Sequence, residues 1–203
     1  HMVVTRAVSH PLLGQLQHQR RRYDRSVTAT PSDDRFRLPR TVLPHRYTLA
    51  LEPDLDAATF VGHVVIDCVA SAPTAAVVLN AAELQIASVR MAGEEVSFSL
   101  DEDTERLTLH HPVGEGPVAV EITFAGTLND KLRGWYRSTF TDESGETRVI
   151  ATSQMQSTDC RRAFPCFDEP DFKAVFDITL VVEPNLMAVS NGPEAERTAQ
   201  DGK

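Results

Sequence analysis

After Arg40 the chain alternates between short apolar runs and clusters of turn-forming residues. Within runs such as 61–69, apolar and polar residues alternate with the two-residue period of a strand that buries one face. Polar links as short as 92–94 and 101–103 favour antiparallel pairing of neighbouring strands. The pattern predicts strands over residues 47–51, 61–69, 76–79, 84–91, 96–100, 106–110, 118–124, 135–140 and 172–182. Many short strands without a repeat period indicate an all-β, antiparallel fold, either a sandwich or a barrel.

One segment departs from the strand pattern. Residues 158–164 begin with Thr158 and Asp159, side chains of the type that caps helices, and continue with good helix formers. Pro165 follows and cannot continue a helix. We therefore expect one short helical turn over residues 158–164.

The amino-terminal region differs from the rest of the chain. It is polar, rich in Gln, Arg and Ser, and ends in a turn-like cluster over 30–34. His1-Met2 resembles the scar of a cleaved affinity tag, with the natural start at Met2. We expect residues 1–35 to form a flexible extension and residues 36–203 to form one β-domain.

Composition and charge exclude several classes of function. The 203 residues are 41% hydrophobic, enough to build a core without disulfides or metals. Five arginines and one aspartate lie in the first 26 residues, so the rest of the chain is more acidic than the net charge of −9 suggests. An acidic body argues against a nucleic-acid partner. No apolar run approaches the roughly 18 residues of a membrane span, and none resembles a signal peptide.

The cysteines point to a reducing compartment. Cys68, Cys160 and Cys166 are odd in number, and the chain lacks secretory features, which favours free thiols and a cytoplasmic location. Cys160 and Cys166 are six positions apart with no histidine nearby in the sequence, a spacing that fits no zinc pattern. We interpret all three as small apolar residues of the interior.

The most distinctive string spans residues 154–174, QMQSTDCRRAFPCFDEPDFKA. It strongly resembles the aminopeptidase N and puromycin-sensitive aminopeptidase family, which has a closely similar segment, T-x-A-R-R-A-F-P-C-F/W-D-E-P-x-x-K-A. Other family-like pieces follow the same order, at 37–47, 53–62, 79–81, 134–138 and 142–151. The resemblance covers roughly residues 36–193. It implies a saddle-shaped β-sandwich that precedes a thermolysin-like catalytic domain.

The resemblance also implies where the chemistry lies. The family uses zinc held by H-E-x-x-H and a downstream glutamate, and G-x-M-E-N to hold the substrate's amino terminus. None of the seven histidines starts an H-E-x-x-H string, and adjacent His110 and His111 would point to opposite faces of a strand. We therefore expect no catalytic, cofactor-binding or metal-binding residue in this chain. The full-length protein is expected to be a zinc aminopeptidase, and this fragment alone is expected to be inactive.

A substrate-binding role is implied for Gln154, Met155 and Gln156, which match the family's Q-x-E segment. In the family this segment contacts the free α-amino group and the first side chain of a peptide. Gln154 retains a carbonyl acceptor for an ammonium group, whereas Gln156 offers a dipole where glutamate would offer a charge. The leukotriene-hydrolase branch of the family similarly has Gln-x-Gln. Met155 either lines the pocket for the first side chain or fills core.

Two alternatives accompany these expectations. The carboxylates of Asp168 and Glu169 resemble a catalytic pair, but Pro165 and Pro170 around them favour a rigid turn whose charges pair locally or across a domain boundary.

The function expected is the removal of amino-terminal residues from peptides, with a downstream catalytic domain and a peptide as partners. The alternative is a non-catalytic β-sandwich scaffold from a relative without zinc ligands.

Overall fold

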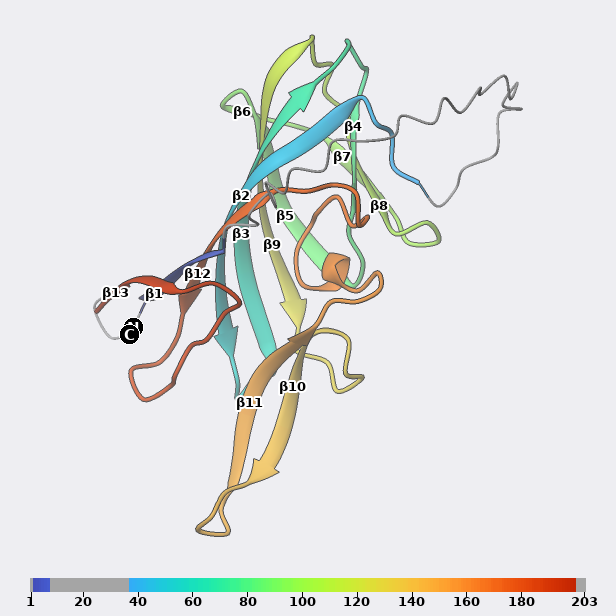
Figure 1. Cartoon of the computed structure of the whole chain (residues 1–203). Helices are drawn as coiled ribbons and strands as arrows, with labels where there is room; N and C mark the ends of the chain where they lie inside the picture. The colour runs from blue at the N-terminus through green and yellow to red at the C-terminus, as the bar shows by residue number, and fades with distance from the viewer. Residues whose placement is uncertain (1, 8–36, 200–203) are drawn as a thin grey trace, which may run out of the picture.

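The computed structural model describes residues 2–7 and 37–199, which form strands and one short 3-10 turn (Figure 1). The elements are β1 (Met2–Ala7), β2 (Val42–Asp54), β3 (Thr59–Ala70), β4 (Val77–Asn80), β5 (Leu84–Met91), β6 (Glu94–Glu95), β7 (Phe98–Asp101), β8 (Arg106–Leu109), β9 (Gly116–Thr127), β10 (Gly134–Thr141), β11 (Thr147–Gln154), η1 (Cys160–Arg162), β12 (Val175–Val181) and β13 (Glu194–Thr198). The all-β class is confirmed. No helix in these described parts has the length and apolar character needed to cross a bilayer.

The described strands form three sheets. The large sheet has the order β13-β1-β12-β2-β3-β9-β5-β6, and a smaller sheet has the order β4-β8-β7. Strands β10 and β11 form a two-stranded ribbon that projects from one end of the molecule (Figure 1). The pairing is antiparallel, as expected, except that β12 lies parallel to β2. Short links predict pairing only between strands that are neighbours in sequence. Strands β2 and β12 pair although most of the chain lies between them.

The core lies between the large sheet and the β4-β8-β7 sheet. Alternate side chains of β3 are buried, including Val64 and Ile66, and they share one apolar cluster with Leu79 and Leu107 of the smaller sheet. Such two-layer burial is the sandwich arrangement. Burial of each large side chain contributes about 1.5–3 kcal/mol relative to exposure.

Two cross-strand pairs explain two glycines in the centre of the large sheet. Gly62 of β3 pairs with Phe124 of β9, and Phe60 pairs with Gly126. A Cβ added at Gly62 would lie 2.3 Å from the Phe124 ring. Each glycine therefore makes room for the aromatic ring opposite it.

The helical turn is shorter than the sequence predicts. Only η1 is helical, and the expected capping role of Asp159 is wrong, because its side chain makes no capping hydrogen bond. Its carboxylate instead accepts a hydrogen bond from Arg162 Nε at 2.9 Å. The Asp159 carboxylate thus pairs with Arg162 where a cap was expected, and the turn is a single one of 3-10 geometry.

Some strands were not predicted. Strand β11 has a largely polar sequence and pairs only with β10. Strands β6 and β13 are short and carry acidic residues. Strand β1 pairs with β12 and β13 although it falls within the segment expected to be an extension. Residues 8–36 of that segment lie outside the described residues, and the division at residue 36 stays a prediction.

Candidate functional site

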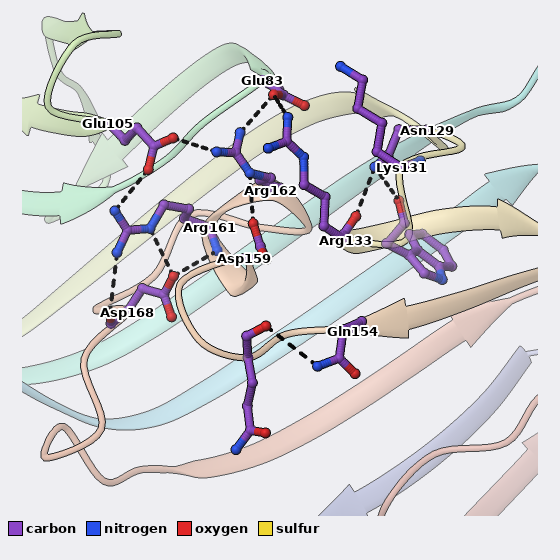
Figure 2. A network of polar contacts seen from close by, with 12 residues as sticks. Glu83, Glu105, Asn129, Lys131, Arg133, Gln154, Asp159, Arg161, Arg162 and Asp168 are labelled. Carbon is purple, nitrogen blue, oxygen red and sulfur yellow. Dashed lines mark hydrogen bonds and ion pairs between the residues drawn. The ribbon is translucent and has the colours of Figure 1, made fainter.

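The predicted substrate segment, Gln154, Met155 and Gln156, lies where the projecting ribbon joins the body of the domain. Gln154 is the last residue of β11 and pairs with Gly134 of β10. The side chains of Gln154 and Gln156 are exposed, and Gln154 Nε2 lies 3.5 Å from the backbone oxygen of Gln156 (Figure 2). A bond of that length is weak, so these amides remain available to a ligand.

Met155 has a different environment from the two glutamines. Its side chain is half-buried and packs against the apolar core, and its carbonyl accepts a hydrogen bond from the amide of Asp159 at 3.0 Å. The substrate segment therefore alternates between an anchored residue and two exposed polar residues. Met155 contacts the core, and its role beside the first side chain of a peptide stays a prediction.

The ribbon continues the exposed surface beyond Gln154. Side chains on one face of paired strands alternate with those of the other face, so Gln154 shares a face with Ile150 and Phe140. Ile150 and Phe140 are 42% and 47% exposed, unusual for large apolar side chains. The opposite face carries Trp135, which is buried in the core. Trp135 thus anchors the base of the ribbon to the domain, and the other face presents apolar and amide groups outward.

The tip of the ribbon is held by a carboxylate. Asp142 Oδ1 accepts a hydrogen bond from Ser144 Oγ at 2.6 Å, and Asp142 Oδ2 accepts one from Arg148 Nε at 2.8 Å. These bonds to the charged form lower the pKa of Asp142 to about 2. The turn is therefore held by an ionised aspartate at neutral pH.

The double arginine of the family-like string lies in an ion-pair network. Arg161 Nε lies 2.9 Å from Asp168 Oδ2, and Arg161 Nη1 lies 3.0 Å from Glu105 Oε2 (Figure 2). Arg162 reaches the other oxygen of Glu105 at 2.5 Å. We call this set the arginine network, and its members are Glu83, Glu105, Asp159, Arg161, Arg162 and Asp168.

The low exposure of its two arginine side chains indicates that the arginine network stabilises the fold. The side chains of Arg161 and Arg162 are only 11% and 12% exposed. Desolvation lowers the pKa of Arg162, but the hydrogen bond that Arg162 donates to Asp159 and the charge of Glu105 outweigh this effect and raise it. Partly buried charges of this kind are stabilising only when they are fully paired. The network therefore fixes the 160–168 turn on the sandwich, with Arg161 paired to Asp168 and Glu105.

The acidic pair between the two prolines is also engaged. Asp168 belongs to the arginine network, and Glu169 accepts hydrogen bonds from the amide of Leu38 at 2.5 Å and from Arg40 at 2.6 Å. The Arg40 guanidinium also lies 4.1 Å from the ring centre of Phe172. The predicted rigid turn with locally paired charges is confirmed.

A hollow among the described residues is lined by none of the residues of the substrate segment. It has a volume of about 610 Å³ and is lined by the β2–β3 turn and the loop after β12, with carboxylates from Glu52, Asp54 and Glu183 and apolar groups from Phe60 and Leu186. Asp54 already accepts hydrogen bonds from the following turn. Sequence reasoning did not find this hollow, because its walls come from segments more than a hundred residues apart.

Only one group of possible metal ligands occurs among the described residues, and it contains no histidine. The Sγ atoms of Cys160 and Cys166 and a carboxylate oxygen of Asp168 lie within 4.8 Å of one another. All three cysteines are free, as expected. The spacing of six positions gave no signal for this group, because the intervening turn brings the thiols together.

Comparison with known proteins identifies the family. A family model for the peptidase M1 N-terminal domain matches residues 43–203. The chain is 47% identical over 178 residues to Aminopeptidase M1-C of Oryza sativa subsp. japonica, a match that covers 82% of this chain and 20% of the relative. The chain belongs to the peptidase M1 N-terminal domain family.

Two further relatives of this M1 N-terminal domain are also named as aminopeptidases. It is 41% identical over 174 residues to the alanine/arginine aminopeptidase of Saccharomyces cerevisiae, covering 82% of this chain and 20% of the relative. It is 39% identical over 176 residues to the puromycin-sensitive aminopeptidase of Caenorhabditis elegans, covering 82% and 19%. The M1 N-terminal domain thus spans about a fifth of the length of these relatives.

The zinc of the family does not fit the residues of this domain. The sequence contains no H-E-x-x-H string, and Cys160, Cys166 and Asp168 are not the histidine and glutamate ligands that the resemblance implies. No metal-dependent step is therefore assigned to this part of the protein.

Proposed function

We propose that this domain is the amino-terminal part of a zinc-dependent aminopeptidase that removes amino-terminal residues from peptides, and that Gln154 and Gln156 bind the peptide's free α-amino group. The support is twofold. Relatives at 39–47% identity are named aminopeptidases. The two glutamines that match the family's binding segment are also exposed and bound to each other only weakly.

The chemistry of the site favours an ammonium ligand. The side-chain carbonyl of a glutamine accepts a hydrogen bond, and an ammonium donates up to three. An ionised acceptor gives about 1.5–3 kcal/mol, and a neutral acceptor about 0.5–1.5. Gln156 in place of glutamate therefore weakens the contact by about 1 kcal/mol, somewhat under a tenfold loss in affinity. Met155, anchored on the core, would position the two glutamines and form a wall beside the first side chain.

The remaining partners follow from the same proposal. The catalytic domain, with its zinc, would pack against the exposed face of the ribbon that carries Phe140, Ile150 and Gln154. Exposed apolar side chains grouped on one face are typical of surfaces that another domain covers. The free thiols are consistent with a cytoplasmic location for the whole protein. This fragment by itself would have no peptidase activity.

The test is a charge substitution in the full-length enzyme. Gln156→Glu should lower KM for short peptides by a factor somewhat under ten and leave kcat nearly unchanged, since it strengthens binding to substrate and transition state alike. Gln85→Glu, at an exposed position on β5, adds the same charge on a different strand and serves as the matched control.

The outcomes separate the proposals. An unchanged KM in Gln156→Glu, or an equal change in the control, removes the binding role of Gln156. Absence of aminopeptidase activity from the full-length protein, together with absence of a downstream H-E-x-x-H string, would instead favour the scaffold interpretation.

A further inference from the structure

Three potential metal-ligand atoms meet beside the arginine network. Cys160 begins η1, Cys166 follows Pro165, and Asp168 lies two residues further along the same turn. The two Sγ atoms and a carboxylate oxygen are all within 4.8 Å of one another. Thiolate sulfur combined with one carboxylate oxygen is a ligand set suited to zinc-like, thiophilic ions.

The backbone that carries these ligands is held on both sides. Cys166 exchanges two hydrogen bonds with Asn80, with N···O distances of 2.8 and 3.0 Å. The amide of Asp168 donates to Asn80 Oδ1 at 3.2 Å, and the amide of Phe167 donates to the Tyr47 hydroxyl at 3.0 Å. At the other end, the Cys160 carbonyl accepts the hydrogen bond that closes η1. The ligands are therefore fixed before any ion arrives, which lowers the cost of binding.

The charges around the group suit a bound cation. The hydrogen bonds from Arg161 Nε and from its amide both end on Oδ2 of Asp168, so Oδ1 is the oxygen left for an ion. Such a bond orients a metal-ligating carboxylate from the outer shell. The Arg161 guanidinium also stands next to two thiols that would become thiolates, so the site does not accumulate uncompensated negative charge.

The solvent access of the two cysteines and the release of their thiol protons narrow the class of ion that this group of ligands can bind. Cys166 is buried, but Cys160 is only half-buried and gives a route from solvent. Both ligand sulfurs belong to free cysteines, so each gives up a proton when it binds a metal ion as a thiolate. Only an ion with high affinity for sulfur displaces both thiol protons at neutral pH, and these two protons leave to solvent on binding. Hard ions such as Mg²⁺ and Ca²⁺ prefer oxygen ligands and do not meet this requirement.

We propose that Cys160, Cys166 and Asp168 form a binding site for one thiophilic divalent ion of the zinc and cadmium class. A water molecule would complete a four-ligand shell on the solvent side of Cys160. The family segment quoted above has alanine at the position of Cys160, so the site is a feature of this chain rather than of that segment.

The test uses the 203-residue chain, freed of metal and kept reduced with a phosphine. Titration with Cd²⁺, followed by the ultraviolet thiolate-to-cadmium charge-transfer band, should saturate at one ion per chain, and added Zn²⁺ should remove the band. Histidines and carboxylates give no such band, so the signal reports thiolate ligation alone. Bound ion should also raise the Tm, since it binds the folded state.

Variants assign the signal to the site. Cys160→Ser keeps the size of a half-buried side chain, and it should lower Cd²⁺ affinity at least about a hundredfold, the upper end of what loss of an outer-shell partner costs. Cys160→Ala should do the same, and circular dichroism checks that both variants are folded. Cys68→Ala removes the third thiol, which lies on β3, and should retain the band at one ion per chain.

Three results would overturn the proposal. They are the lack of a charge-transfer band in the unaltered chain, an unchanged Cd²⁺ affinity in folded Cys160→Ser, and a band that disappears in folded Cys68→Ala. None of them bears on KM for peptides in the full-length enzyme, so failure here is separable from failure of the proposed function.

Discussion

The arginine network and the substrate segment are neighbours in sequence but opposite in environment. Arg161 and Arg162 are nearly buried and bonded at short distances to Glu105 and Asp168. Five to eight positions earlier, Gln154 and Gln156 are exposed and joined by one 3.5 Å contact. The double arginine of the family-like string holds the fold together. The two glutamines at the start of the same string, which are proposed to bind substrate, contribute little to the fold.

The physical reason for the difference is desolvation. A partly buried arginine loses water contacts and needs its carboxylate partners to compensate, so each member of the network depends on the others. An exposed amide keeps its water until a ligand replaces it. Changes in the two regions should therefore differ both in size and in the property that they alter.

The largest effect is expected for Arg161→Ala. It leaves Asp168 without its cationic partner in a nearly buried position, and breaking such a pair costs about 3–5 kcal/mol in the free energy of unfolding. Urea denaturation of the 203-residue chain measures this. Arg197→Ala is the matched control, because it removes an exposed pair with Glu194 and should cost at most about 1 kcal/mol. Equal costs for the two variants would show that the arginine network is not structural.

A smaller effect is expected for Tyr47→Phe. The Tyr47 hydroxyl accepts the hydrogen bond of the Phe167 amide, and burial raises the pKa of this phenol, so it remains neutral. The variant leaves a buried amide unsatisfied, at a cost of about 1–3 kcal/mol. Tyr136→Phe, at a half-buried position of the ribbon, should change the free energy of unfolding by no more than about 0.5 kcal/mol. If the control is the more costly variant, the proposed anchoring of the 166–168 turn is wrong.

The smallest effect on stability is expected for the double variant Gln154→Ala and Gln156→Ala. Both side chains are exposed, so unfolding of the isolated chain should change by no more than about 0.5 kcal/mol. In the full-length enzyme the same variant should raise KM for peptides, because two acceptors for the α-amino group are lost. A loss of more than about 1 kcal/mol in the isolated chain would contradict the comparison and assign a structural role to these glutamines.

Sequence patterning predicted the strands that face the core and missed those that do not. Residues 61–69 and 118–124 alternate cleanly, because β3 and β9 bury one face against the smaller sheet. Strand β11 escaped notice because both of its faces are largely accessible, so burial imposes little period on its sequence. The prediction that Asp159 caps the helical turn was wrong because helix propensity describes only local backbone preferences. In the structure Arg162 binds the Asp159 carboxylate that a cap would use.

The sequence by itself determined the all-β class, the alternation of the core strands and the family, since each is written in neighbouring residues. The partners of the charged and thiol groups were decided by the tertiary structure. Arg161 meets Glu105 across 56 positions, Phe167 meets Tyr47 across 120, and the turn between Cys160 and Asp168 brings two thiols and a carboxylate together. Local periodicity carries no information about such long-range contacts, because these contacts depend on how distant strands pack and on which buried groups must be paired.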